Sequence, residues 1–499
     1  MGTSANRAKA KRKTQKQRAA VQELAPIRSE FAAANLGDDR LTKRLQMIAD
    51  AFGAAPGRSF PPMLGSAAAV EGGYRFFNNK RVSLARVLEP HSTKTAERAR
   101  ACESVLVLHD GTNLVYSCEG DLRRGFGRFG NQQGIQALVS LAVSFDEGGE
   151  SMTRNDDHVP LGVVGCQTRA GPNKKKKPGR KSRSNRKGTT WGSYRSTEWL
   201  SSIASARSAL GSQKKLIHVI DREADGLELF VKVHADGDGF VVRVSCKRRV
   251  ALGDEDEPDE FQKIRAAAKN LPRLFEEQIH VERRGYISPK QANPPRSARL
   301  ATLTFAAGRI QIEKGDHLSG NDSIPNLFQL NLVHVKERDA PPGEEPIEWF
   351  LVTREPIATE DDVRRVVRIY RARWLIEEFF RVLKTGCGIE KRQAESRAAL
   401  EAILAVAFAV SWRIIFLRHK SRLDAEAPAT LVFTPAELDL LRAMHRLPKN
   451  ATLQQALLAI AAMGGHLKSN GPPGNVVLAR GLEKLEIQAE VWALAMVKM

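Results

Sequence analysis

The sequence has few cysteines, and none of the five among its 499 residues stands in a CxxC pair. Its eleven histidines show no HxxxH or HxH spacing. These absences exclude a disulfide framework and a zinc site, and they are typical of a reduced intracellular protein. The longest apolar run, residues 402–410, is far shorter than the ~20 residues of a membrane-spanning helix, and the N-terminus lacks the apolar segment of a secretory signal. We therefore expect a cytoplasmic protein with no membrane contact.

Acidic residues are missing from two segments that carry most of the excess positive charge. The chain has 78 Lys and Arg against 57 Asp and Glu, a net charge of +21. Residues 1–18 hold seven basic residues and residues 169–187 hold ten, with no acid in either segment. Blocks of like charge repel themselves, remain unfolded and bind polyanions. Because these blocks contain almost no apolar residues, nucleic acid is favoured over a membrane surface as the partner.

Helical periodicity begins after the basic tail. Apolar residues recur at helical spacing from Leu41 to Phe52, and the residues off this stripe include Arg40, Lys43 and Arg44. A linker over 56–62, a helix over 67–78 and another from Ser83 follow. Three short helices with basic outer faces predict a DNA-binding head, although a helical cap on the next domain explains this region equally well.

The rest of the chain is predicted to be a mixed α/β domain followed by helices. Short apolar runs at 105–108, 114–116, 135–144, 161–164, 216–220 and 239–244 read as strands, with helices over 196–210 and 226–233. Residues 251–345 read as an all-β insertion. Helices are expected over 396–417, 436–446, 453–463 and 480–497. The predicted domains are a disordered tail (1–24), a helical DNA-binding domain (25–95), an α/β domain (96–395, with a lysine-rich loop at 169–187) and a C-terminal helical domain (396–499).

Two carboxylates stand at the ends of predicted strands, which is where ligands bind in open α/β sheets. These are Asp110 and Asp221, and either one alone is better explained as the cap of a turn. A third carboxylate changes this balance. In a predicted helix from Thr359 to about residue 384, four polar side chains fall within an arc of about 60°, with the apolar residues opposite; the four are Tyr370, Arg373, Glu377 and Lys384.

Converging carboxylates can hold a pair of Mg²⁺ ions, which activate an attacking oxygen and stabilise the leaving oxygen of a phosphodiester. Arg373 and Lys384 on the same helix face could grip a phosphate beside that centre. Phosphodiester chemistry on DNA is therefore the activity that these residues favour.

The spacing Tyr370-x2-Arg373-x3-Glu377-x6-Lys384 resembles the YREK signature of the insertion-sequence-four family of bacterial DDE transposases. Further similar segments are 34–38, 73–77, 109–112, 220–225 and 349–353, so the resemblance extends from about residue 31 to the C-terminus. It implies an RNase H-like core with a β-rich insertion. It also implies that two Mg²⁺ ions, for which Mn²⁺ can substitute, are bound by Asp110, Asp221 and Glu377.

The resemblance further implies cleavage of both strands at transposon ends through a DNA hairpin, and joining of the 3′ ends to target DNA. In the family pattern Tyr370, Arg373 and Lys384 hold the phosphate of the strand that is not attacked. Trp349 aligns with an aromatic residue that stacks on a flipped base, although a core tryptophan is an equal alternative. Trp374 aligns with an aromatic residue near the same site, where a packed tryptophan is the safer interpretation, and Arg243 is expected to contact DNA.

Family members act as homodimers on double-stranded DNA. The last predicted helix carries an apolar stripe that could form the dimer contact or pack on its own core: Leu478, Leu482, Leu485, Trp492 and Met496. Two other functions remain open, a catalytically inactive DNA-binding protein derived from a transposase and a nuclease that cuts without joining. The presence of all three carboxylates and the complete YREK set disfavours the inactive protein.

Overall fold

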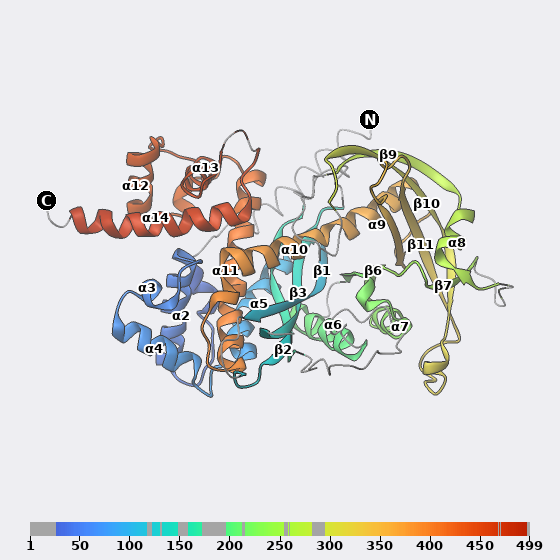
Figure 1. The fold of residues 1–499 in the computed structure, drawn as a ribbon, viewed down its shortest axis with the longest axis horizontal. Coiled ribbons are helices and arrows are strands. Elements are labelled where there is room, and N and C mark those ends of the chain that lie inside the picture. The colour runs from blue at the N-terminus through green and yellow to red at the C-terminus, as the bar shows by residue number, and fades with distance from the viewer. Residues whose placement is uncertain are drawn as a thin grey trace.

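The structure, a computed structural model, describes residues 26–496 except 117–121, 130–131, 148–157, 172–195, 212–214, 254–257, 259, 282–294, 468 and 470. The expected basic tail and most of the lysine-rich loop lie outside the described residues. The described strands form one long sheet with helices packed against it. In the view of Figure 1 the N-terminal helices lie at the lower left and the last helices of the chain lie above them.

The N-terminal helices begin at the polar residues that the sequence suggests. Helix α2 (Asp39–Ala54) is capped by Asp38, α4 (Ala67–Phe77) by Ser66 and α5 (Leu84–Arg100) by Ser83. The predicted stripe of α2 is largely buried, with Leu45 and Phe52 fully enclosed. A short 3₁₀ helix η1 (Ile27–Phe31) precedes α2. The expected linker over 56–62 instead runs into a short helix, α3 (Phe60–Leu64), because its two prolines stand in the first turn, where no backbone N–H is needed.

The first part of the sheet consists of β1 (Ser104–Tyr116), β2 (Gly127–Phe129), β3 (Gln132–Phe145), β4 (Pro160–Ala170), β5 (Leu216–Ile220) and β6 (Gly239–Arg243). Strands β1, β5 and β6 are parallel neighbours, and β3 pairs antiparallel with both β1 and β4. Helices α6 (Ser196–Leu210) and α7 (Leu227–Ala235) flank β5 in sequence as predicted, with a 3₁₀ turn η2 (Arg222–Ala224) between β5 and α7. The mixed α/β class is thus confirmed.

Strand β1 corrects the predicted position of Asp110. Sequence analysis predicted two strands, over 105–108 and 114–116, with the Gly-Thr-Asn after Asp110 as a turn between them. The structure has one continuous strand, because β3 pairs with β1 along its whole length. In this register Asp110 lies opposite Val139 and Gly111 opposite Leu138. Asp110 therefore lies in the middle of a strand rather than at its end.

The predicted all-β insertion continues the central sheet. It comprises β7 (Arg249–Leu252), β8 (Gln262–Lys263), β9 (Arg273–Val281), β10 (Arg299–Glu313), β11 (Leu327–Glu337) and β12 (Glu348–Thr353), with short helical turns α8 (Ile264–Ala267), η3 (Ala268–Asn270) and η4 (Asp316–Leu318). Within it, β10 is the longest of these strands, with 15 residues. Because β12 pairs antiparallel with β6, this segment extends the central sheet in the order β6-β12-β11-β10 (Figure 1).

The predicted long helix from Thr359 is divided into three pieces. Helix α9 (Glu360–Ala372) begins at Thr359, whose side chain forms a capping box with Asp362. The helix breaks at Arg373, continues as α10 (Trp374–Arg381) and ends in a π-helical turn, η5 (Val382–Gly386), followed by a 3₁₀ turn η6 (Ile389–Lys391). Such π turns concentrate at functional sites.

The C-terminal region is helical, as predicted: α11 (Arg397–Leu423), η7 (Ala429–Leu431), α12 (Pro435–His445), α13 (Leu453–Met463) and α14 (Asn475–Met496). Helix α11 is long and apolar enough to cross a membrane by length and composition, but 89% of its most apolar window is buried inside the protein, as in a core helix. Helices α13 and α14 approach so closely that a Cβ on Gly481 would lie 2.0 Å from the Ile460 carbonyl oxygen. On α14, Leu478 and Leu485 are buried against the chain's own core.

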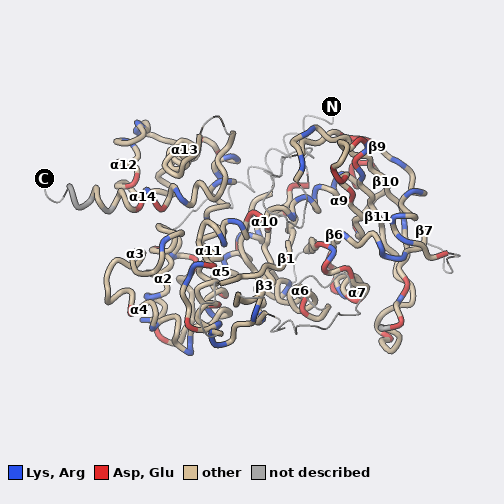
Figure 2. Tube along the Cα trace, viewed as in Figure 1, with Lys and Arg blue, Asp and Glu red and all other residues tan. Residues whose placement is uncertain are grey.

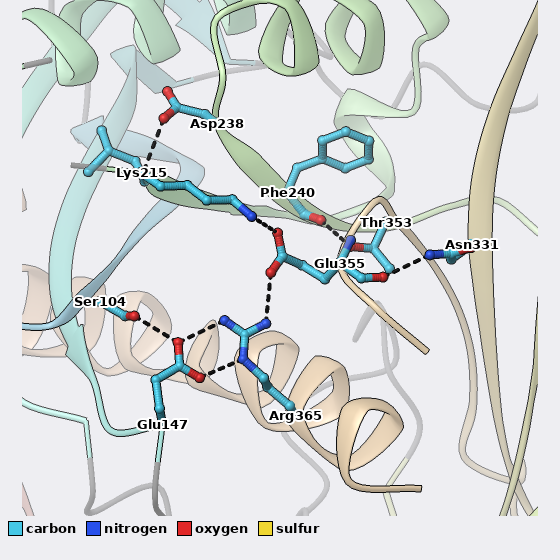
Figure 3. A network of polar contacts seen from close by, with 10 residues as sticks. Ser104, Glu147, Lys215, Asp238, Phe240, Asn331, Thr353, Glu355 and Arg365 are labelled. Atoms are coloured by element: carbon cyan, nitrogen blue, oxygen red, sulfur yellow. Dashed lines mark hydrogen bonds and ion pairs between the residues drawn. The ribbon is translucent and has the colours of Figure 1, made fainter. Parts of the chain in front are cut away.

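An ion-pair network fastens the start of α9 to the sheet (Figure 3). The Arg365 guanidinium donates to both oxygens of Glu147, at 2.5 and 2.8 Å, and to Glu355 Oε2 at 2.7 Å. Lys215, next to β5, donates to Glu355 Oε1 at 2.8 Å, and Ser104 at the start of β1 donates to Glu147. Because Glu355 is 3% exposed, its charge depends on these partners.

We predict that Arg365→Met lowers the free energy of unfolding by about 3 kcal/mol, because it leaves Glu355 buried with one partner fewer. Chemical denaturation of the full chain measures this loss. The matched control is Arg338→Met, which removes a half-exposed guanidinium that pairs with Glu276 and the exposed Asp339 and should cost far less, because these pairs lie in solvent. Equal losses in the two variants would contradict the role given to the network.

A second buried network joins the N-terminal helices to the sheet. Glu30 accepts from Arg98 Nη1 at 2.8 Å and lies 2.6 Å from His91 Nδ1. The backbone N–H of Val163 in β4 donates to His91 Nε2, so the proton of a neutral His91 lies on Nδ1 and points at Glu30. Burial opposes the charge on Glu30, but the hydrogen bond from His91 and the charge and hydrogen bonds of Arg98 outweigh burial and lower the pKa of Glu30 to about 2.

This depressed pKa predicts acid sensitivity of the fold. The stabilisation from ionised Glu30 is complete above its ordinary pKa of 4.5 and is lost as the pH falls toward 2. Melting temperatures measured from pH 6 to pH 3 should fall more steeply for the natural chain than for Glu30→Gln, which is less stable at neutral pH but lacks this titration. Parallel curves for the two proteins would show that Glu30 does not carry the effect.

Candidate active site

Three acidic residues from three separate elements converge on one guanidinium. Asp110 comes from the middle of β1, Asp221 follows the end of β5, and Glu377 lies on α10. Arg373, at the break between α9 and α10, donates to Asp110 Oδ2 at 3.2 Å, lies 4.0 Å from Asp221 Oδ2 and donates to Glu377. The structure therefore brings together the three carboxylates that sequence analysis selected.

A second arginine binds the same carboxylate group. Arg243, the last residue of β6, donates from Nε to Asp221 Oδ1 at 2.6 Å and from Nη2 to Oδ2 at 2.7 Å. This contact follows from the parallel pairing of β5 with β6, which sets the two strand ends side by side. Sequence analysis expected Arg243 to contact DNA, and it did not foresee the pair with Asp221.

The surroundings shift the pKa values of Asp110 and Asp221 in opposite directions. Burial raises the pKa of Asp110 to about 7, with Arg373 opposing the shift and the charges of Glu377 and Asp221 adding to it. Burial also disfavours ionised Asp221, but its hydrogen bonds and ion pair with Arg243 outweigh burial and lower its pKa. Since burial is the largest cause of this shift and the acidic neighbours only add to it, a positive charge bound beside Asp110 would favour its ionised form.

The remaining members of the predicted motif lie around this cluster. Tyr370 is buried, and burial raises its pKa to about 12, with the charge of Asp221 adding to the shift. Lys384 lies in the π turn, and its Nζ donates to the carbonyl of Asn113, three residues beyond Asp110 on β1. Lys384 thus contacts the strand that carries Asp110, although the helix that carries it is not continuous.

The two tryptophans differ in their surroundings. Trp349 on β12 packs edge-on against Tyr370, with ring centroids 5.5 Å apart, and its side chain is half-buried. Trp374 follows Arg373 directly and is 41% exposed, so the interpretation of Trp374 as a packed core residue is wrong. The Trp349 ring therefore lies beside Tyr370, whereas Trp374 is the sequence neighbour of Arg373.

Comparison with known proteins now bears on this geometry. The family model of transposase DNA-binding domains matches residues 25–82, and that of transposase DDE domains matches residues 200–412. The chain therefore matches the models of both a transposase DNA-binding domain and a transposase DDE domain. The matched DDE range contains Asp221 and all four YREK positions, whereas Asp110 lies outside it. Among solved structures, a cryo-EM structure of the piggyBac transposase synaptic complex with hairpin DNA is 9% identical, with 81% of this chain and 75% of that chain covered and a TM-score of 0.31.

DDE transposase domains generally use divalent metal ions, and the donor chemistry of the cluster fits such ions. The carboxylates of Asp110, Asp221 and Glu377 offer hard oxygen ligands around a place already occupied by positive charge. Over the described residues, however, no three acidic, histidine or cysteine side chains are arranged around a common point as metal ligands are. The guanidinium of Arg373 lies among the three carboxylates instead.

The DNA-binding domain carries the basic residues selected from the sequence on α2. Lys43 is exposed, Arg40 is exposed and paired with Asp38 at 3.0 Å, and the Arg44 guanidinium lies over α4, where a Cβ on Gly72 would come within 2.9 Å of it. Lys and Arg residues are spread over the whole fold, including these N-terminal helices and α9 (Figure 2). Arg40, Lys43 and Arg44 belong to a different part of the chain from the carboxylates and remain predicted DNA contacts.

Sequence analysis missed a buried polar chain inside the DDE core. His109 Nε2 lies 2.9 Å from His218 Nδ1, and Ser140 Oγ lies 2.9 Å from His109 Nδ1. His218 Nε2 in turn lies 3.4 Å from Asp238. Both histidines are fully buried, and burial together with the nearby His218 lowers the pKa of His109. The sequence offered one signal for these histidines, which is their position next to the selected aspartates. His109 directly precedes Asp110, and His218 precedes Asp221 by three residues.

Proposed function

We propose that this chain is an Mg²⁺-dependent transposase of the insertion-sequence-four family, similar to the transposase of transposon five. It binds the inverted repeats at the ends of its transposon, cleaves both strands through a hairpin and joins the 3′ ends to target DNA. The observation that carries this proposal is the convergence of Asp110, Asp221 and Glu377 on one guanidinium, within a chain that holds transposase DNA-binding and DDE domains.

The strand order supports the RNase H-like core that the resemblance implies. Strands β4, β3, β1, β5 and β6 lie side by side in that order, with the last three parallel and β3 antiparallel to β1. This arrangement places Asp110 and Asp221 on adjacent parallel strands, so the two carboxylates come from the same region of the sheet. Helix α10 then adds Glu377 from one side.

Asp110, Asp221 and Glu377 would hold the two Mg²⁺ ions, with Mn²⁺ as a substitute. Bound there, the ions supply activation of the attacking oxygen and stabilisation of the leaving oxygen of the phosphodiester. The chain's own residues position the DNA. Arg373 and Lys384 provide charged donors for the phosphate of the strand that is not attacked, as the family pattern assigns.

The aromatic pair beside the cluster has the geometry to hold an extruded base. Trp349 is half-buried and lies edge-on to Tyr370, so part of its ring remains accessible for stacking. Trp374, exposed beside Arg373, offers a second aromatic surface. We assign Trp349 to the flipped base and Trp374 to DNA near the cleaved bond.

The partners and location follow from the same proposal. The protein binds double-stranded DNA as a homodimer in the bacterial cytoplasm. Because Leu478 and Leu485 are buried in the chain's own core, a dimer contact through α14 would use residues nearer its C-terminal end, where Val491 is 62% exposed.

The decisive variant is Glu377→Gln, which keeps the shape of the side chain and removes its charge. With a duplex carrying the DNA that flanks this gene, we expect at least about 100-fold less cleavage on a denaturing gel and nearly unchanged binding in a gel-shift assay. The matched control is Glu378→Gln, whose side chain instead contacts Arg418 and Asn475 in the C-terminal helices and should still permit cleavage.

Each other outcome selects a different function. Full cleavage by Glu377→Gln would overturn the assignment of the catalytic carboxylates. Specific binding by the natural chain without any cleavage would favour the inactive DNA-binding protein. Cleavage without joining of the 3′ ends would favour the hydrolytic nuclease.

A salt titration tests the DNA-binding role of α2. If Lys43 contacts a phosphate, Lys43→Ala should reduce the slope of log binding constant against log salt concentration by about 0.9. Lys449→Ala, an exposed lysine between α12 and α13, is the control and should leave the slope unchanged. The same slope for Lys43→Ala and the natural chain would place the DNA contact elsewhere.

A further inference from the structure

The contact between Arg243 and Asp221 occupies both oxygens of a carboxylate needed for metal binding. The guanidinium spans the carboxylate with two short hydrogen bonds, of 2.6 and 2.7 Å, in the fork geometry that makes such pairs strong. The two side chains are 23% and 21% exposed, so solvent screens the pair only partly. A divalent cation that took Asp221 as a ligand would have to displace this arginine from at least one oxygen.

Charge counting disfavours two metal ions beside both arginines. The three carboxylates and the two guanidinium groups of Arg243 and Arg373 carry a formal total of −1. Each divalent cation adds +2, so two ions would leave the cluster at +3 if both arginines stayed. Arg373 reaches three carboxylates, whereas the ion pair of Arg243 is with Asp221. Departure of Arg243 therefore breaks one ion pair rather than three, and it leaves at Asp221 only the backbone N–H of Arg222 on Oδ1 and the more distant Arg373, 4.0 Å from Oδ2.

The surroundings of Arg243 indicate the position that its guanidinium would take after leaving Asp221. Its guanidinium lies 5.9 Å from the ring centre of Tyr370, which also contacts Trp349. In the proposed function this is the DNA side of the cluster. A DNA phosphate arriving there offers Arg243 an anionic partner equivalent to the one that it leaves.

We propose that Arg243 is a latch on the metal site: in the DNA-free protein it closes Asp221 to divalent cations, and a DNA phosphate draws it away. The proposal rests on the proposed function. Because linkage is reciprocal, a phosphate that takes Arg243 raises metal affinity by the factor by which bound metal raises DNA affinity. Metal loading, and with it cleavage, is thereby favoured in the DNA-bound protein.

The chain contains a matched control in the same region. Arg248 pairs with Asp225, four residues after Asp221, through Nε at 2.8 Å, and these two side chains are 20% and 11% exposed. The contact resembles the Arg243 pair in residue types and burial but lies outside the group of three carboxylates. A general effect of removing an arginine near the site would appear in both variants, and release of Asp221 in only one.

The test is Mn²⁺ binding to the full chain without DNA, followed by electron paramagnetic resonance of the free ion. Mn²⁺ ions that the natural chain binds and Asp221→Asn does not bind are assigned to this site. We expect Arg243→Gln to bind Mn²⁺ at least about tenfold more tightly than the natural chain, a change of about 1.4 kcal/mol. Arg248→Gln should bind Mn²⁺ as the natural chain does. Equal affinity in the natural chain and Arg243→Gln, or equal tightening in both variants, would overturn the proposal.

Adding end DNA tests the coupling. A precleaved duplex should tighten Mn²⁺ binding to the natural chain and have little further effect on Arg243→Gln. Equal tightening of both proteins by DNA would contradict the latch. If circular dichroism shows that Arg243→Gln does not fold, Arg243→Lys replaces it, because a lysine cannot span both oxygens; its affinity should lie above that of the natural chain, and an unchanged affinity overturns the proposal.

This experiment separates failure of the latch from failure of the proposed function. The comparison of Mn²⁺ affinities without DNA requires no cleavage. Unchanged affinity beside normal end cleavage would remove the latch and leave the transposase. Tighter Mn²⁺ binding by Arg243→Gln beside absent cleavage by the natural chain would support the latch on a metal site whose reaction is not transposition.

Discussion

The geometry of the carboxylate cluster depends on the guanidinium of Arg373. This group places a positive charge among carboxylates from three elements that are far apart in sequence. Without a positive charge between them, Asp110, Asp221 and Glu377 would repel one another in a partly buried place. The break between α9 and α10 puts this arginine at the junction, where its side chain reaches back to two strands and forward to the next helical turn. The helix is thus held to the sheet through the residues that the chemistry needs.

The same helical segment links the site to the rest of the molecule. At the start of α9, Arg365 bridges Glu147 and Glu355 and so fixes the helix against the sheet. Beyond the π turn, Arg392 donates to the carbonyls of Pro56 and Cys387 and lies 4.2 Å from the ring centre of Phe52 in α2. The DNA-binding helices are therefore anchored to the end of the segment that carries Glu377. Rigid contacts at both ends leave local side-chain movement, above all of the arginines, as the adjustment by which the site could accept metal.

The sequence predicts which residues form the site better than it predicts the contacts between them. The spacing of Tyr370, Arg373, Glu377 and Lys384 marked one helix face, and Asp110 and Asp221 were found beside apolar strands. The pair of Arg243 with Asp221 depends on the parallel register of β5 and β6, which no local pattern encodes. Likewise the Gly-Thr-Asn after Asp110 has turn chemistry, but pairing with β3 keeps it extended. Long-range pairing decided each of these cases.

The most direct test of the central claim is the crystal structure of this chain with end DNA and Mn²⁺, using anomalous scattering to locate the metal. The account predicts anomalous peaks between Asp110, Asp221 and Glu377, with Arg243 withdrawn from Asp221 and close to a DNA phosphate. DNA bound in the same crystals with no peak at the three carboxylates, and both arginines still paired with them, would contradict it.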